Sequence, residues 1–137
     1  IAEDPAQSSV KVTVDLTSID TKDEGRDAHL RSADFFNTDA NSSMVFESTA
    51  VRASGDHWDV DGNLTLNGVT NSLTLAVEFE GATIDPWNNI RLGFSANGEL
   101  NRDDFGVSWS QALETGGLVV GKTVKLSIDA EATAPQA

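Results

Sequence analysis

Residues 21–39 read TKDEGRDAHLRSADFFNTD, and this stretch breaks a pattern that the rest of the chain keeps. Elsewhere apolar and polar residues alternate. Here the apolar residues recur at spacings of two to three with charges between them: Ala28, Leu30, Ala33, Phe35 and Phe36. This spacing predicts a short helix or two helical turns, and Thr21 followed by Glu24 is typical of a capping box. Because so short a helix is not stable alone, we expect its apolar side to rest on the open end or the flank of a sheet.

The remaining sequence consists mainly of segments in which apolar and polar residues alternate with a period of two, as in half-buried strands. Six strands are predicted, at residues 9–16, 43–53, 57–66, 73–80, 90–101 and 124–130. Asn67-Gly68 is a strong hairpin signal between the third and the fourth. We expect residues 101–121 to be irregular and the tail, 132–137, to be frayed.

Six amphipathic antiparallel strands with mostly short connections predict an all-β fold, either a barrel or a sandwich. With 137 residues, the chain is predicted to form a single domain over positions 1–137. A barrel that holds one small ligand has about eight strands, so the six predicted strands fall short of that number.

Composition excludes several classes of function. The net charge of −13 argues against nucleic acid and against an anionic membrane surface as partners. No apolar run approaches the roughly 20 residues of a membrane-spanning helix. There is no cysteine, and the two histidines, His29 and His57, lie far apart, so we expect no metal site. The first residues show no signal peptide, and the compartment, cytoplasmic or exported, stays unassigned.

The apolar phase of each predicted strand identifies the residues that we expect to face inward. They are Met44, Phe46, Trp58, Leu64, Leu66, Leu75, Val77, Phe79, Phe94 and Leu126. Four aromatic residues outside the strands join them as candidates, namely Phe35, Phe36, Phe105 and Trp109. Such a set forms either an ordinary packed core or the lining of an apolar ligand cavity, and the pattern alone leaves both open.

Two polar residues are candidates for more than packing. His29 either lies at the cavity mouth, where it binds a ligand head group or acts as a base, or hydrogen-bonds to fix the helix against the barrel. Arg102 either pairs with a carboxylate such as Asp27 or Asp34, or meets a phosphate head group. No nucleophile elbow, phosphate-binding glycine loop or zinc motif is present. We therefore expect no catalytic residues, and a protein that is not an enzyme.

The segment DAHLRSADFF at 27–36 resembles the D-x-H-L-x-S-x-D-F-F signature of the YceI-like family. Further segments agree with it in order and spacing: SIDT at 18–21, GNLTLNGVT at 62–70, Asn101-Arg102-x-x-Phe105-Gly106, and ETGG at 114–117 followed by Val120-Gly121. The resemblance implies an antiparallel, lipocalin-like β-barrel of eight strands with an elongated apolar cavity. It also implies non-catalytic binding of a polyisoprenoid, an isoprenoid quinone or a similar long-chain amphiphile, with no cofactor beyond such a lipid.

The resemblance also implies two further strands before the segment that begins near Ser8. Six strands plus these two give eight, so we expect the chain to lack the first two strands of the family fold. The edge at residues 9–16 would then pair with a second copy, as a homodimer, or with another segment. The alternative function is a structural or protein-interaction β-domain with a packed core and no ligand.

Overall fold

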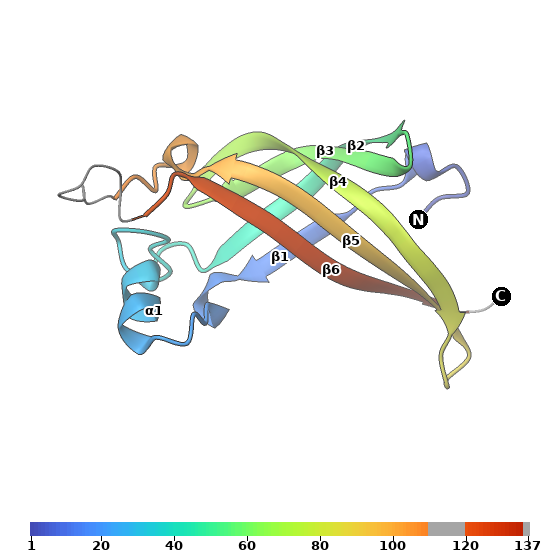
Figure 1. The fold of residues 1–137 in the computed structure, drawn as a ribbon, viewed down its shortest axis with the longest axis horizontal. Coiled ribbons are helices and arrows are strands. Elements are labelled where there is room, and N and C mark those ends of the chain that lie inside the picture. The colour runs from blue at the N-terminus through green and yellow to red at the C-terminus, as the bar shows by residue number, and fades with distance from the viewer. Residues whose placement is uncertain (110–119, 136–137) are drawn as a thin grey trace.

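The protein folds as one curled antiparallel sheet of six strands, described by a computed structural model at residues 1–109 and 120–135. The strands follow one another in chain order: β1 (Lys11–Asp15), β2 (Ser43–Ser54), β3 (His57–Leu66), β4 (Val69–Ile84), β5 (Asn89–Asn101) and β6 (Thr123–Pro135). Figure 1 shows them wrapped into a half-barrel, with α1 (Glu24–Arg31) at one end and the β4–β5 hairpin at the other. The predicted all-β barrel class is confirmed.

Three short 3-10 helices complete the described structure: η1 (Pro5–Gln7), η2 (Leu16–Ser18) and η3 (Arg102–Phe105). Within the described residues, none of the helices has the length and hydrophobicity that crossing a membrane requires. Residues 110–119, which include the ETGG segment, lie outside the described residues.

The predicted helix is present but starts and ends differently from the expectation. Its N-cap is Asp23, whose carboxylate accepts from the backbone N–H of Arg26 at 3.0 Å, so the predicted Thr21 capping box was wrong. The helix ends at Arg31, and the segment that carries Phe35 and Phe36 continues as turns.

Several strand boundaries also differ. β1 ends at Asp15 because the Asp15 side chain caps η2, taking a hydrogen bond from Thr17 N–H at 2.9 Å. β6 extends to Pro135, so the expectation of a frayed tail was wrong for residues 132–135. These residues pair with the start of β5, where Ala132 lies opposite Leu92 and Pro135 opposite Asn89. Because the strand that pairs with residues 132–135 lies about 40 residues away in the sequence, the local pattern does not predict that these residues form a strand.

The cross-strand register places all ten predicted inward residues on one face, the concave face. Phe46 lies opposite Leu64, Trp58 opposite Val77, and Phe79 opposite Phe94. The buried hydrophobic core lies on this face and beneath the loops at the α1 end; it consists of Leu16, Phe35, Phe46, Val60, Leu64, Leu66, Leu75, Leu100, Phe105 and Val107. Phe79 is the departure, because 55% of it is exposed.

Two glycines let core side chains approach the backbone of a neighbouring strand. A Cβ on Gly62 would lie 2.4 Å from the Phe46 ring and 2.6 Å from the carbonyl oxygen of Glu47. A Cβ on Gly98 would lie 2.7 Å from a methyl group of Leu75. The packing of the sheet therefore requires glycine at both positions, because any larger residue would place a Cβ atom where it must displace core side chains.

Replacing Gly62 by alanine should lower the free energy of unfolding by about 1 to 3 kcal/mol, because the added methyl group must displace the Phe46 ring or the β2 backbone. The matched control is Gly93→Ala in β5, where the nearest atom would be the Glu80 Cβ at 3.6 Å, an ordinary contact. That variant should stay within about 0.5 kcal/mol of the parent protein. Urea denaturation measures both, and equal effects would contradict the packing described for Gly62.

Candidate functional site

Burial of the concave face is greatest at Leu75 in β4 and falls from there toward the hairpin end. Leu75 is 5% exposed, Val77 is half-buried, Phe79 is 55% exposed and Ile84 is 58% exposed. The ring centroids of Phe79 and Phe94 lie 5.7 Å apart. The protein's own side chains thus fill the concave face at one end, and leave an apolar aromatic surface at the other.

The closed end is organised by Arg102, which is only 3% exposed. Its guanidinium donates four hydrogen bonds to backbone carbonyls: Nη1 to Val107 at 2.7 Å and to Trp109 at 2.6 Å, Nη2 to Val120 at 3.2 Å, and Nε to Gly121 at 2.9 Å. The side chain thereby ties the segment after η3 to the segment before β6. The expected pairing of Arg102 with Asp27 or Asp34 was wrong, because backbone carbonyls accept these hydrogen bonds.

His29 joins α1 to the same closed end through aromatic contacts. Its ring lies edge-on to Phe35, with centroids 4.9 Å apart, and edge-on to Trp109 at 4.6 Å. Its Nε2 lies 2.9 Å from an Asp34 carboxylate oxygen, which fixes the ring from the solvent side. The guanidinium carbon of Arg102 lies 5.8 Å from the Phe35 centroid, within cation–π range. This geometry is that of a junction residue between helix and sheet.

Hydrogen bonds hold α1 against the chain that precedes it. Asp27 is buried and accepts from both the backbone N–H and the hydroxyl of Thr21. Arg26 donates to the Thr21 carbonyl at 2.9 Å, and Arg31 donates to the Ile19 carbonyl at 2.9 Å. The charged residues between the apolar positions of the 21–39 stretch thus fasten the helix, while Phe35 fills the core.

The other predicted site residues divide between the filled and the open parts of the concave face. Leu64, Leu66 and Phe105 are buried, and Phe36, Met44 and Leu126 are half-buried against the core. Trp58 and Phe94 are half-buried outside that cluster. Four buried core residues are missing from the candidate set: Leu16, Val60, Leu100 and Val107. The first three stand on the apolar phase of their predicted strands, whereas Val107 follows η3 and shows no strand periodicity.

The outer face carries the polar chemistry. Arg52 donates to Asp61 at 2.8 Å and Thr74 donates to the same carboxyl group at 2.7 Å, and these bonds lower the pKa of Asp61 to about 2. At the start of β3, the hydrogen bond that the His57 ring donates to the Asp56 carboxylate, followed by the one that it donates to Asp59, raises the pKa of His57. None of these groups faces the concave side.

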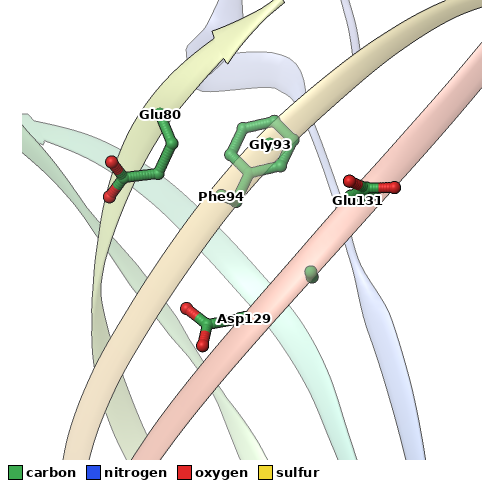
Figure 2. A pocket seen from close by; sticks show the side chains of 6 residues that line it. Glu80, Gly93, Phe94, Asp129 and Glu131 are labelled. Carbon is green, nitrogen blue, oxygen red and sulfur yellow. The ribbon is translucent and has the colours of Figure 1, made fainter. Parts of the chain in front are cut away.

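A shallow hollow of about 290 Å³ lies beside Gly93, where β4, β5 and β6 run side by side. Figure 2 shows its lining, which consists of Glu80, Gly93, Phe94, Asp129, Ala130 and Glu131. Glu80 accepts a hydrogen bond from Ser95 at 2.6 Å, and Arg91 pairs with Glu131 at 2.8 Å. Among the described residues, no cluster of His, Cys, Asp and Glu is arranged to hold a metal ion.

Comparison with known proteins places these features in a family. Residues 1–132 match the model of the YceI-like domain. A "UPF0312 protein" of Serratia proteamaculans is 46% identical over 106 residues, covering 77% of this chain and 55% of the relative. "Protein YceI" of Escherichia coli O157:H7 is 46% identical over 105 residues, with the same coverage. The chain thus spans about half the length of the curated relatives it matches.

Solved structures show the same architecture. The Campylobacter jejuni YceI protein superposes with a TM-score of 0.81 at 27% identity, covering 94% of this chain and 74% of the other. Burkholderia cenocepacia BcnA superposes with a TM-score of 0.79 at 22% identity, covering 93% and 76%, and this second likeness shows the fold alone.

Replacing Arg102 by methionine should lower the free energy of unfolding by about 3 kcal/mol, because four carbonyls lose a charged donor in a buried site. Arg52→Met is the matched control, since the Arg52 side chain is 55% exposed and its pairing with Asp61 is open to solvent. Thermal unfolding of both variants tests this. A loss for Arg102→Met no greater than that for Arg52→Met would contradict the structural role of Arg102.

Proposed function

This chain belongs to the YceI-like family, and from that premise we propose that it binds the tail of a long-chain amphiphile on its concave face. The ligand is a polyisoprenoid, an isoprenoid quinone or a similar lipid. The observation that carries the proposal is the decrease in burial along β4 from Leu75 toward the hairpin, which leaves Phe79 55% exposed on the same face as the buried core residues. An apolar tail lying there would extend the core rather than require a new one.

The energetics favour a ligand that is long and apolar. Burial of apolar surface contributes roughly 25 cal/mol per Å², so a tail that covers the open part of the concave face binds without many polar contacts. The aromatic pair Phe79–Phe94 offers large, stiff contact area at small entropic cost. A polar, water-soluble substrate would find few hydrogen-bonding side chains on the concave face, because the polar side chains of these strands lie on the outer face of the sheet.

The positions of the ionisable groups whose pKa values are shifted support binding rather than catalysis. Asp61 and His57, whose pKa values shift, lie on the outer face or beside the β2–β3 turn, and their shifts come from local hydrogen bonds. His29 and Arg102 are engaged at the closed end by aromatic rings and backbone carbonyls. An acid–base pair aimed at the concave face is therefore absent from the described residues, which fits a carrier.

We propose further that additional strands close the seam between β1 and β6. In the described sheet these two strands are terminal, and each has an outer edge without a strand partner. An open edge beside an apolar face would leave a bound tail wet and would invite pairing. The Campylobacter jejuni YceI structure, of which this chain covers 74%, is longer. Two strands from a longer protein, or from a second copy, would bring the sheet to about eight strands.

The same open edges favour a second candidate function. A strand of another protein could add to β1 or β6 and cover the exposed apolar residues without any lipid. The protein would then be a structural or interaction domain. The two candidates differ in a single observable, which is whether a small apolar molecule accompanies the purified protein.

We expect an organic-solvent extract of natively purified protein to contain a long-chain lipid at close to one molecule per binding unit. Mass spectrometry of the extract identifies it, with protein stripped by unfolding and refolding as the control. An extract without lipid, combined with no binding of a long-chain isoprenoid alcohol by the stripped protein, would contradict the proposed function.

Replacing Phe79 by serine should weaken binding of a fluorescent isoprenoid alcohol about tenfold, because it removes an exposed aromatic contact worth on the order of 1.4 kcal/mol. The free energy of unfolding should change by less than about 1 kcal/mol, since the side chain is more than half exposed. Glu78→Ser, on the opposite face of the same strand, is the control and should bind as the parent protein does. Equal affinities for all three proteins would place the ligand elsewhere.

A further inference from the structure

The tip of the β4–β5 hairpin presents large apolar side chains to solvent. Trp87 is 76% exposed and Ile84 is 58% exposed, and both are far more accessible than the apolar residues at the α1 end. The tip lies at the end of the half-barrel opposite α1 (Figure 1). Exposed tryptophan at a projecting turn is typical of a surface that meets a partner.

The turn is held rigidly by Asp85, whose side chain is only 4% exposed. Its carboxylate accepts from the backbone N–H groups of Trp87 and Asn89, each at 2.9 Å, and from Arg91 Nη2 at 3.1 Å. The Asp85 backbone N–H donates a further hydrogen bond to the Asn89 carbonyl at 3.0 Å. Because the turn is already ordered, a partner that binds Trp87 loses little conformational entropy in doing so.

The tip is also an uncharged region of a strongly acidic protein. The chain has a net charge of −13, yet residues 84–90 contain a single charged side chain, Asp85, which is buried against Arg91. The end of β6 that pairs with this region contributes Ala134 opposite Ile90 and Pro135 opposite Asn89. A partner at the tip therefore meets apolar and neutral polar groups rather than carboxylates.

An unbroken apolar path leads from the tip to the core. Ile84 pairs with Ile90, Ala82 with Leu92, and Phe79 with Phe94. Alternation along β5 keeps Ile90, Leu92 and Phe94 on the same face as buried Leu100. The concave face thus opens at the tip and is filled at the α1 end, so a long tail has one apolar route along the sheet.

We propose that the β4–β5 hairpin tip docks on the interface of a bilayer with zwitterionic head groups, and that the amphiphile passes between membrane and concave face there. This inference rests on the proposed function. Tryptophan favours the membrane interface, where its ring meets apolar chains and its N–H meets polar groups. The net charge of −13 disfavours anionic lipid, which selects a bilayer without surface charge as the partner.

Vesicle flotation with phosphatidylcholine tests the docking. Trp87→Ser should lower the partition coefficient of the full chain about tenfold, since it removes the largest exposed apolar group at the tip. The control is Ile1→Ser, because Ile1 is 77% exposed but lies outside the tip, and its partitioning should equal that of the parent protein. Vesicles that contain phosphatidylglycerol should bind the parent protein more weakly at low salt.

A second measurement separates docking from ligand binding. An isoprenoid alcohol delivered from cyclodextrin, without any membrane, should bind Trp87→Ser and the parent protein equally well. Docking is overturned if the parent protein does not float with phosphatidylcholine, or if Trp87→Ser floats as the parent does, whatever the cyclodextrin result. Docking as a route for the ligand is overturned if the parent protein floats but takes up no isoprenoid from cyclodextrin, a result that also contradicts the proposed function.

Discussion

One apolar face on a sheet that does not close on itself is the constraint on which the rest of the structure depends. The register puts most of the large hydrophobic side chains of the six strands on the concave side, and β1 and β6 do not pair with each other. The protein can bury that face in only two ways, with its own loops or with something bound. Its own loops bury the face at the α1 end, and the part of the face along the β4–β5 half stays exposed.

Different interactions order the two ends of the half-barrel, and the two ends differ in whether their apolar side chains are buried or exposed. At the α1 end, a buried guanidinium from Arg102 fixes two loop segments through their carbonyls, and His29 packs between Phe35 and Trp109. At the hairpin end, Asp85 orders the turn but leaves Trp87 exposed. The ordered loops at the α1 end cover the core and exclude water from it, whereas the ordered turn at the hairpin end holds an apolar side chain in solvent.

The sequence predicted what periodicity encodes, and missed what depends on distant partners. Alternation located six strands and the shared face of residues such as Phe46 and Leu64, because side chains of a strand change sides at every step. The partners of Arg102 are backbone carbonyls, which any residue supplies, so no carboxylate pattern could reveal them. The exposure of Phe79 follows from where the sheet stops being covered, which is a property of the whole fold. The extension of β6 to Pro135 follows from pairing with β5.

The most direct test of ligand binding on the concave face is an isotope-filtered NMR measurement of an unlabelled isoprenoid alcohol bound to methyl-labelled protein. The account predicts intermolecular nuclear Overhauser effects between the isoprenoid chain and the methyl groups of Val77 and Ile128, which pack at the edge of the core on that face. It predicts none to Val45, which alternates with Phe46 onto the outer face. Contacts to Val45 without contacts to Val77 and Ile128, at saturating ligand, would contradict it.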